Sequence, residues 1–246
     1  MRWCGRCMLP SRMHARERNE AEEDEMTKAI AVVAHYDDAV IWAGGAIRRT
    51  HALGWDWMIV CTCAVEPSRR GYFLESCDAL GARGVALEFV DHPDGGPFSR
   101  NAREALCAAV REAARSAAPD WVFTHSLDRD GEYGPHPNHS EAAEAIASLA
   151  GEGILRVSQI AHFAYRKMYG VPDLGPVARS EASHYLQLDY DELRWKAEWC
   201  GKANDVEMSD PTLGKNTWLR RLGWPCPNPE AFTGTGLRLP APFVGQ

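Results

Sequence analysis

No stretch of this 246-residue sequence approaches the roughly 20 apolar residues that a helix needs to cross a bilayer. The charged N-terminus has no apolar segment typical of a secretory signal, so we expect a cytoplasmic protein. Basic residues are fewer than acidic ones, 27 against 34, and the net charge of -7 argues against a nucleic-acid partner. The phosphate-binding motifs G-x-G-x-x-G and Walker A are absent, so close packing of a helix on a sheet explains Gly44-Gly45 better than a nucleotide cofactor does.

Eight cysteines are present, but the chain is long and has no export signal, so we expect reduced thiols rather than a disulfide framework. Cys61, Cys63, Cys77, Cys107 and Cys200 lie in apolar or helical surroundings. A C-x-x-C pair near the N-terminus, Cys4 and Cys7, is half of a zinc-binding pattern without a second pair at a suitable spacing. It does not predict a structural metal site.

The distribution of polar and apolar residues predicts one α/β domain, residues 28–246, after a poorly ordered extension, residues 1–27. Expected strands and helices alternate, which indicates a mostly parallel sheet with helices on both faces. The strands are expected at 29–33, 57–63, 85–90, 121–124 and 160–165, and the helices at 39–53, 72–80, 102–117, 140–149 and 190–200. The Pro- and Gly-rich tail from Trp224 is expected to be loop.

Metal-ligating side chains follow the first expected strand, where the chain reads Ala34-His35-Tyr36-Asp37-Asp38. The carboxyl ends of parallel strands form the edge at which α/β proteins bind ligands. An imidazole and two adjacent carboxylates at that edge are the groups that a divalent metal with a bound water requires, because one carboxylate ligates while its neighbour accepts a proton.

A second group of imidazoles follows the strand expected at 121–124, in the segment His136-Pro137-Asn138-His139. Asn138 as helix cap, with Glu141 three residues later, forms a capping-box-like pattern. This pattern places His139 in the first helical turn and His136 just before it. Each group alone is weak evidence, but both follow strands of one sheet, and together they predict a metal site.

The expected chemistry is hydrolysis by a metal-activated water. Three ligands of types His, Asp and His leave a coordination position open, as catalytic zinc requires. We assign Asp37 as the base that activates the zinc-bound water, and His136 as the group that stabilises the oxyanion or protonates the leaving amine. Another divalent metal remains an alternative to Zn²⁺.

These motifs resemble those of the LmbE-like, or PIG-L-like, N-acetylglucosaminide deacetylases, which carry Ala-His-Pro-Asp-Asp-Glu and His-x-Asp/Asn-His. The resemblance covers most of residues 28–235 and implies a Rossmann-like three-layer α/β sandwich with a mostly parallel sheet and the active site at the C-terminal edge of the strands. It implies His35, Asp38 and His139 as zinc ligands, Asp37 as base and His136 as second catalytic group.

Substrate contacts are implied by weaker similarities to the same family. Arg69 falls where the family has a substrate-side arginine, Asp94 lies in a Pro-Asp-Gly that binds sugar, and Tyr133 resembles a mobile tyrosine near the metal. Tyr36 replaces the usual Pro and is expected to add an aromatic ring beside the metal. Ala39 replaces the usual Glu, and these departures indicate a divergent substrate pocket.

We therefore expect a zinc hydrolase that deacetylates an N-acetylglucosamine-type sugar on a larger conjugate. The Ala- and Arg-rich composition is typical of high-GC bacteria, which makes a secondary metabolite, such as an antibiotic, a candidate carrier. An amidase acting on a thiol-sugar conjugate or a longer acyl chain is the nearest alternative, and a non-catalytic sugar-binding module is a more distant one. The sequence leaves a homo-oligomer open.

Two further features stay ambiguous in the sequence. His125, at the end of the strand expected at 121–124, supports a metal ligand or is a satisfied polar residue at a strand terminus. Several of the nine tryptophans either pack in the core or offer a stacking face to a sugar. They are Trp55, Trp57, Trp195, Trp199, Trp218 and Trp224.

Overall fold

The computed structural model describes residues 26–89, 99–127, 136–166, 177–209 and 229–245. Its main sheet has eight strands in the order β10-β8-β9-β5-β4-β1-β2-β3. The strands that pair in parallel are β1 (Lys28–Val33), β2 (Asp56–Cys61), β3 (Ala82–Ala86), β4 (Trp121–Thr124) and β5 (Gln159–Phe163). The antiparallel ones are β8 (His184–Leu186), β9 (Glu230–Thr233) and β10 (Val244–Gly245). β6 (Tyr165–Arg166) and β7 (Val177–Ala178) form a separate small sheet.

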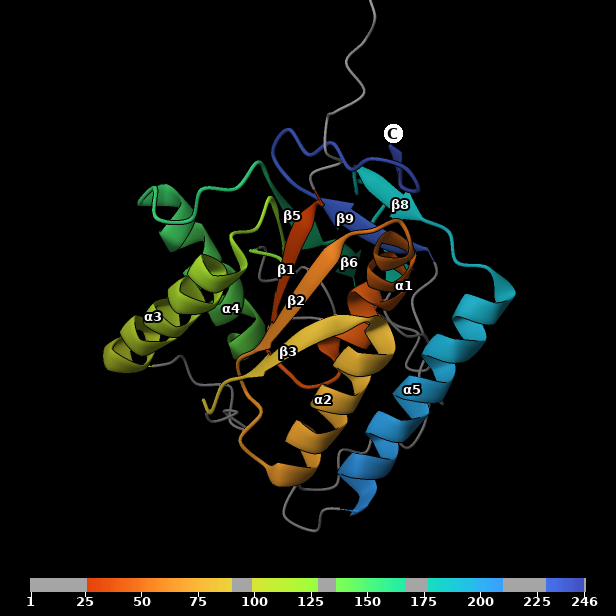
Figure 1. Cartoon of the computed structure of the whole chain (residues 1–246), viewed down its shortest axis with the longest axis horizontal. Helices are drawn as coiled ribbons and strands as arrows, with labels where there is room; N and C mark the ends of the chain where they lie inside the picture. Colours follow the sequence, from red (N-terminus) through yellow and green to blue (C-terminus); the bar gives the residue numbers. More distant parts are fainter. Residues whose placement is uncertain (1–25, 90–98, 128–135, 167–176, 210–228, 246) are drawn as a thin grey trace, which may run out of the picture.

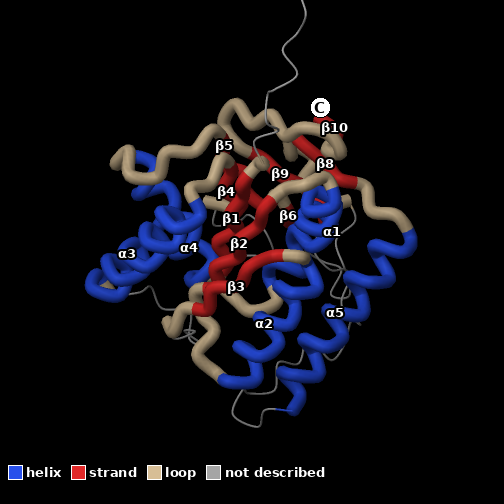
Figure 2. Tube along the Cα trace, viewed as in Figure 1, coloured by secondary structure: helices blue, strands red, loops and turns tan. Residues whose placement is uncertain are grey.

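Helices cover both faces of the sheet, and the α/β sandwich with a mostly parallel sheet is confirmed (Figures 1 and 2). On one face lie α1 (Asp38–Ala52), α2 (Pro67–Leu80) and α5 (Tyr190–Ser209), and on the other lie α3 (Arg100–Ala117) and α4 (Pro137–Gly151). Successive side chains of a strand point to opposite faces, so β1 contributes Ala29 and Ala31 to one core and Ile30 and Val32 to the other. None of the helices in the described ranges is long and apolar enough to cross a membrane.

Some element boundaries differ from the expected ones. β3 begins at Ala82 rather than Val85, and α2 begins at Pro67, five residues before the expected start at Tyr72. Proline is favoured at the first helical position because it has no N–H to leave unbonded. The prediction that the tail from Trp224 is loop is wrong in the described part of that tail, because β9 lies there, between β5 and β8 in the sheet.

A buried ion pair anchors α1 against β9 and α5. Lys196 Nζ lies 2.6 Å from Glu230 Oε1, and both side chains are fully buried. The Glu230 carboxylate also accepts the backbone N–H groups of Gly45 and Ala46 at 2.8 and 2.7 Å. A Cβ on Gly45 would meet Leu188 at 2.2 Å, so close packing does require glycine there, as expected from the sequence.

The described cysteines are free thiols, as expected for Cys61, Cys63, Cys77, Cys107 and Cys200. Burial raises the pKa of the Cys77 thiol to about 12. Such a thiol is protonated at neutral pH and therefore poorly reactive. Residues 1–25, with Cys4 and Cys7, lie outside the described residues.

Candidate metal centre

The candidate site lies where the strand order reverses. β1 is followed through α1 by β2 on one side, whereas β4, which arrives after β3 and α3, pairs with β1 on the other side. Crevices at such reversal points, outside the carboxyl ends of the strands, are the usual ligand sites of open α/β sheets. His35 and Asp38 follow β1 here, and His125 follows β4.

The start of α4 brings the second group of imidazoles to the same edge, by a cap different from the expected one. Pro137 is the first helical residue and His136 the cap, so Asn138 lies inside the helix. The capping box is therefore wrong: Glu141 accepts from Arg103 of α3 at 3.0 Å, and the Asn138 amide lies 3.5 Å from Nε2 of His35. His139 does lie in the first helical turn, as expected.

Three donor atoms form a nearly equilateral triangle. His35 Nδ1 is 3.1 Å from His139 Nε2 and 3.3 Å from Asp38 Oδ2, and the third side, His139 Nε2 to Asp38 Oδ2, is 3.5 Å. Ligands at about 2.0–2.1 Å from a tetrahedral zinc ion stand about 3.3 Å apart. The two imidazoles and one carboxylate therefore fit three corners of a zinc coordination sphere.

Two other imidazoles adjoin this triangle. Two overlapping groups of donor atoms in the described part of the chain could also hold a metal, His35-His136-His139 and Asp38-His125-His139, each within 4.8 Å of one another. The His136 ring lies 4.6 Å from that of His35, edge to face. His136 thus stands beside the proposed ligands, at a distance suited to a bound substrate or to the metal itself.

His125 is completely buried and contacts both His139 and Asp38. Its ring stacks on that of His139 at 4.0 Å, and its Nε2 lies 3.2 Å from Asp38 Oδ2. The same Nε2 lies 2.9 Å from the N–H of Ala34, which it accepts. Since its single lone pair is directed at that amide, His125 is suited to support the ligands rather than to bind the metal.

The surroundings of Asp38 keep its carboxylate charged. Burial by itself would raise its pKa, but the surrounding imidazoles, His139 first among them, hold the pKa well below its usual range. Asp37, 8% exposed, precedes Asp38 at the start of α1, where the helix dipole favours a negative charge. An ionised carboxylate and an adjacent carboxyl group at one helix N-terminus suit metal-assisted hydrolysis.

Trp42 is a site residue that the sequence reasoning missed. Its indole N–H donates to Asp38 Oδ1 at 3.0 Å, and the side chain is buried. The i, i+4 spacing on a helix was the available signal, because residues four apart share a face.

Of the expected substrate contacts, the structure describes Arg69 and Tyr36, while Asp94 and Tyr133 lie outside the described residues. Arg69, in the first turn of α2, is 8% exposed, and its guanidinium lies 5.4 Å from the centre of the Tyr36 ring. Tyr36 is 3% exposed and donates to the carbonyl of Ala203 in α5. Its ring therefore packs beneath Arg69, within the core, rather than lying open to a substrate.

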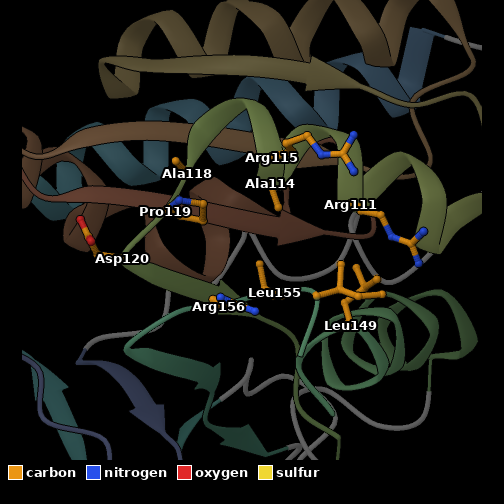
Figure 3. Close-up of a pocket in the computed structure, with 10 residues that line it drawn as sticks. Arg111, Ala114, Arg115, Ala118, Pro119, Asp120, Leu149, Leu155 and Arg156 are labelled. Atoms are coloured by element: carbon orange, nitrogen blue, oxygen red, sulfur yellow. The ribbon is translucent and has the colours of Figure 1, made fainter. Parts of the chain in front are cut away.

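Cavities occur at both edges of the sheet. A cavity of about 460 Å³ adjoins the candidate metal centre, since His162 in its wall bonds the carbonyl of His125 at 2.7 Å. Its polar lining includes Ser126, Arg179, Thr233 and Thr235. Another, of about 370 Å³, lies at the opposite edge, beside the residues that precede β4 and β5 (Figure 3). Only the first of these two is placed to extend the site.

Comparison with known families gives one match. The family model described as PIG-L, GlcNAc-PI de-N-acetylase, matches residues 30–150, the segment that holds His35, Asp38, His136 and His139. No curated protein matches the chain.

Solved structures share the fold at low identity. The zinc-inhibited form of teicoplanin deacetylase Orf2 is 14% identical, with a TM-score of 0.54 and coverage of 79% of this chain and 90% of that one. N,N'-diacetylchitobiose deacetylase from Pyrococcus horikoshii is 20% identical, with a TM-score of 0.53 and coverage of 86% and 84%. GalB, the 4-carboxy-2-hydroxymuconate hydratase from Pseudomonas putida KT2440, is 17% identical, with a TM-score of 0.56 and coverage of 87% and 98%.

Proposed function

We propose that this chain, whose residues 30–150 match the PIG-L family model, is a metal-dependent hydrolase that deacetylates an N-acetylglucosamine-type sugar on a larger conjugate. The observation that carries the proposal is the triangle of donor atoms from His35, Asp38 and His139, with sides of 3.1 to 3.5 Å. This triangle lies at the sheet edge where the fold binds ligands, and Asp37 is next to it in sequence.

His35, Asp38 and His139 would hold the metal. Two imidazoles and one carboxylate are a usual donor set for catalytic zinc. A bound zinc ion supplies a Lewis acid that polarises a carbonyl and makes hydroxide available near neutral pH. One of the compared deacetylases is a zinc-inhibited form, so the amount of metal needs to be controlled in any assay.

The protein side chains move the protons of the reaction. Asp37 accepts a proton from the attacking water, whose oxygen forms the new bond to the acetamide carbon. His136 stabilises the developing oxyanion, and a proton reaches the amine nitrogen as the C–N bond breaks. The products are acetate and the free amine of the sugar, so one water molecule is consumed for each acetyl group removed.

The substrate groups beyond the amide are assigned by position. Arg69, whose guanidinium lies over the ring of Tyr36, is a predicted contact to hydroxyl groups of the sugar, as are Asp94 and Tyr133. The cavity of about 460 Å³ beside His125 and His162 would take part of the carrier, because it adjoins the metal centre and has a polar lining.

A substrate panel with defined metal content tests the function. The purified chain is stripped with a chelator and loaded with one equivalent of Zn²⁺. Free amine is then measured on N-acetylglucosamine, N,N'-diacetylchitobiose, a thiol-sugar conjugate, and acetylated and long-acyl glycopeptides. Amine release from an acetylated conjugate supports the deacetylase, whereas preference for the thiol-sugar or long-acyl compounds supports the alternative amidase. A chain that binds zinc and releases no amine from any of them refutes the proposal, and a chain that binds sugar without metal revives the non-catalytic module.

A further inference from the structure

The two oxygens of the Asp38 carboxylate have different surroundings. Oδ2 faces the imidazoles, at 3.3 Å from His35 Nδ1, 3.2 Å from His125 Nε2 and 3.5 Å from His139 Nε2. Oδ1 faces away from them and accepts the indole N–H of Trp42 at 3.0 Å. An indole N–H is a donor only, so Trp42 cannot itself bind a metal. Its hydrogen bond can, however, hold the carboxylate oxygen that faces away from the proposed metal.

Trp42 is fixed independently of Asp38. Its side chain is 4% exposed, and its ring packs on Tyr165 at 4.9 Å between centres. The hydroxyl of Tyr165, which is fully buried, donates to the carbonyl of Trp42 at 2.9 Å and accepts the N–H of Ala231 at 3.0 Å. One turn further along α1, the amides of Gly45 and Ala46 are bound by the buried Glu230 carboxylate. Trp42 therefore belongs to a rigid part of α1, held by residues on β6 and β9.

We propose that Trp42 is a positioning residue for the metal centre, which holds Asp38 so that only Oδ2 is presented beside His35 and His139. This inference rests on the ligand set of the proposed function. A rotated carboxylate would exchange its oxygens or offer both, and the indole bond opposes that rotation. Groups that orient metal ligands typically contribute 10- to 100-fold in metal affinity.

The test compares Trp42→Phe with a matched control, Trp57→Phe. Trp57 is also buried, at 1% exposed, and its indole N–H also donates one hydrogen bond, to Thr50 Oγ1 at 2.9 Å. It lies near the start of β2, paired with Ala29 at the start of β1, so it is at the edge of the sheet away from the metal centre. The two variants thus lose the same kind of bond and the same ring area, and only one loses it at Asp38.

The readouts are the Kd for Zn²⁺, from competition with a chromophoric chelator, and the visible spectrum of the Co²⁺-loaded protein, which reports ligand geometry. We expect Trp42→Phe to weaken Zn²⁺ binding about 10- to 100-fold and to change the Co²⁺ spectrum. We expect Trp57→Phe to stay within about twofold of the wild type, although both variants lose thermal stability.

The outcomes separate the two proposals. If the wild type binds Zn²⁺ tightly and Trp42→Phe binds it equally well with an unchanged Co²⁺ spectrum, the positioning role is refuted and the proposed function stands. If the wild type itself does not bind Zn²⁺, the proposed ligand set fails, and the positioning role fails with it. Should Trp42→Phe not fold, 3-benzothienylalanine at position 42 keeps the ring shape without the N–H donor and gives the same comparison.

Discussion

Replacing Lys196 with methionine tests whether the buried ion pair with Glu230 holds α1 in place. Both side chains are fully buried and the Nζ–Oε1 distance is 2.6 Å, so Lys196→Met leaves a carboxylate in the core without its cation. Removing one partner of such a pair typically costs about 3–5 kcal/mol. Glu230 keeps two backbone N–H donors, from Gly45 and Ala46, and we therefore expect a loss near the lower end, about 3 kcal/mol.

The assay is urea unfolding followed by tryptophan fluorescence. With a slope of about 2–3 kcal/mol per molar urea, a loss of about 3 kcal/mol lowers the midpoint by about 1–1.5 M. The control is Arg100→Met, which breaks the exposed i, i+4 pair with Glu104 at 3.0 Å and should leave the midpoint nearly unchanged. A midpoint for Lys196→Met within about 0.3 M of the wild type would refute the reasoning, because it would mean that the carboxylate is not held in the core as a charge.

The remaining predictions concern the site. Asp37→Ala should lower kcat about 10²- to 10⁴-fold with zinc content unchanged by metal analysis, and full activity would exclude Asp37 as base. Removing zinc with a chelator should abolish amine release and lower the thermal midpoint, since a ligand at 100 times its Kd adds about 2.7 kcal/mol; one equivalent of Zn²⁺ should restore both. Thr235→Trp, in the wall of the cavity beside His162, should lower kcat/KM for large conjugates at least tenfold and spare N-acetylglucosamine, whereas equal losses would place the carrier elsewhere. The lowered pKa of Asp38 stabilises the fold at pH values above the unfolded value of about 3.8, and this stabilisation is lost as the pH falls toward the folded-state pKa. In metal-free protein the difference in unfolding free energy between wild type and Asp38→Asn should therefore shrink below about pH 4, and a difference that grows there would contradict the direction of the shift.

Strong local patterns predicted the parallel part of the fold. The strand expected at 121–124 is β4 to the residue, and the strand expected at 29–33 is β1 with one more residue at its start. These short runs are buried on both faces of the sheet, so they are continuously apolar, which is the pattern expected of a central parallel strand. The tail was mispredicted because β9 has no distinctive pattern of its own and exists through its pairing with β5 and β8.

Competition between partners explains the error at the start of α4. Asn138 and Glu141 have the right types and spacing for a capping box, but Arg103 of α3 binds Glu141, and the helix begins at Pro137, two residues earlier than a cap at Asn138 would allow. A local motif cannot reveal a cation that another helix supplies. Tyr36 is a similar case: its position beside His35 suggested a ring facing the metal, whereas α2 and α5 pack around it and turn it toward the core.

The sequence by itself determined the residue types of the site and the edge on which they lie, because two groups of ligating side chains follow two apolar runs that each read as a buried strand. Only the tertiary structure decided which atoms meet. The triangle of His35, Asp38 and His139, the support from His125, and the indole bond from Trp42 depend on how β1 and β4 pair and how α1 and α4 start. Periodicity fixes which face a side chain takes within its own element, whereas distances between elements are set by packing across the sheet.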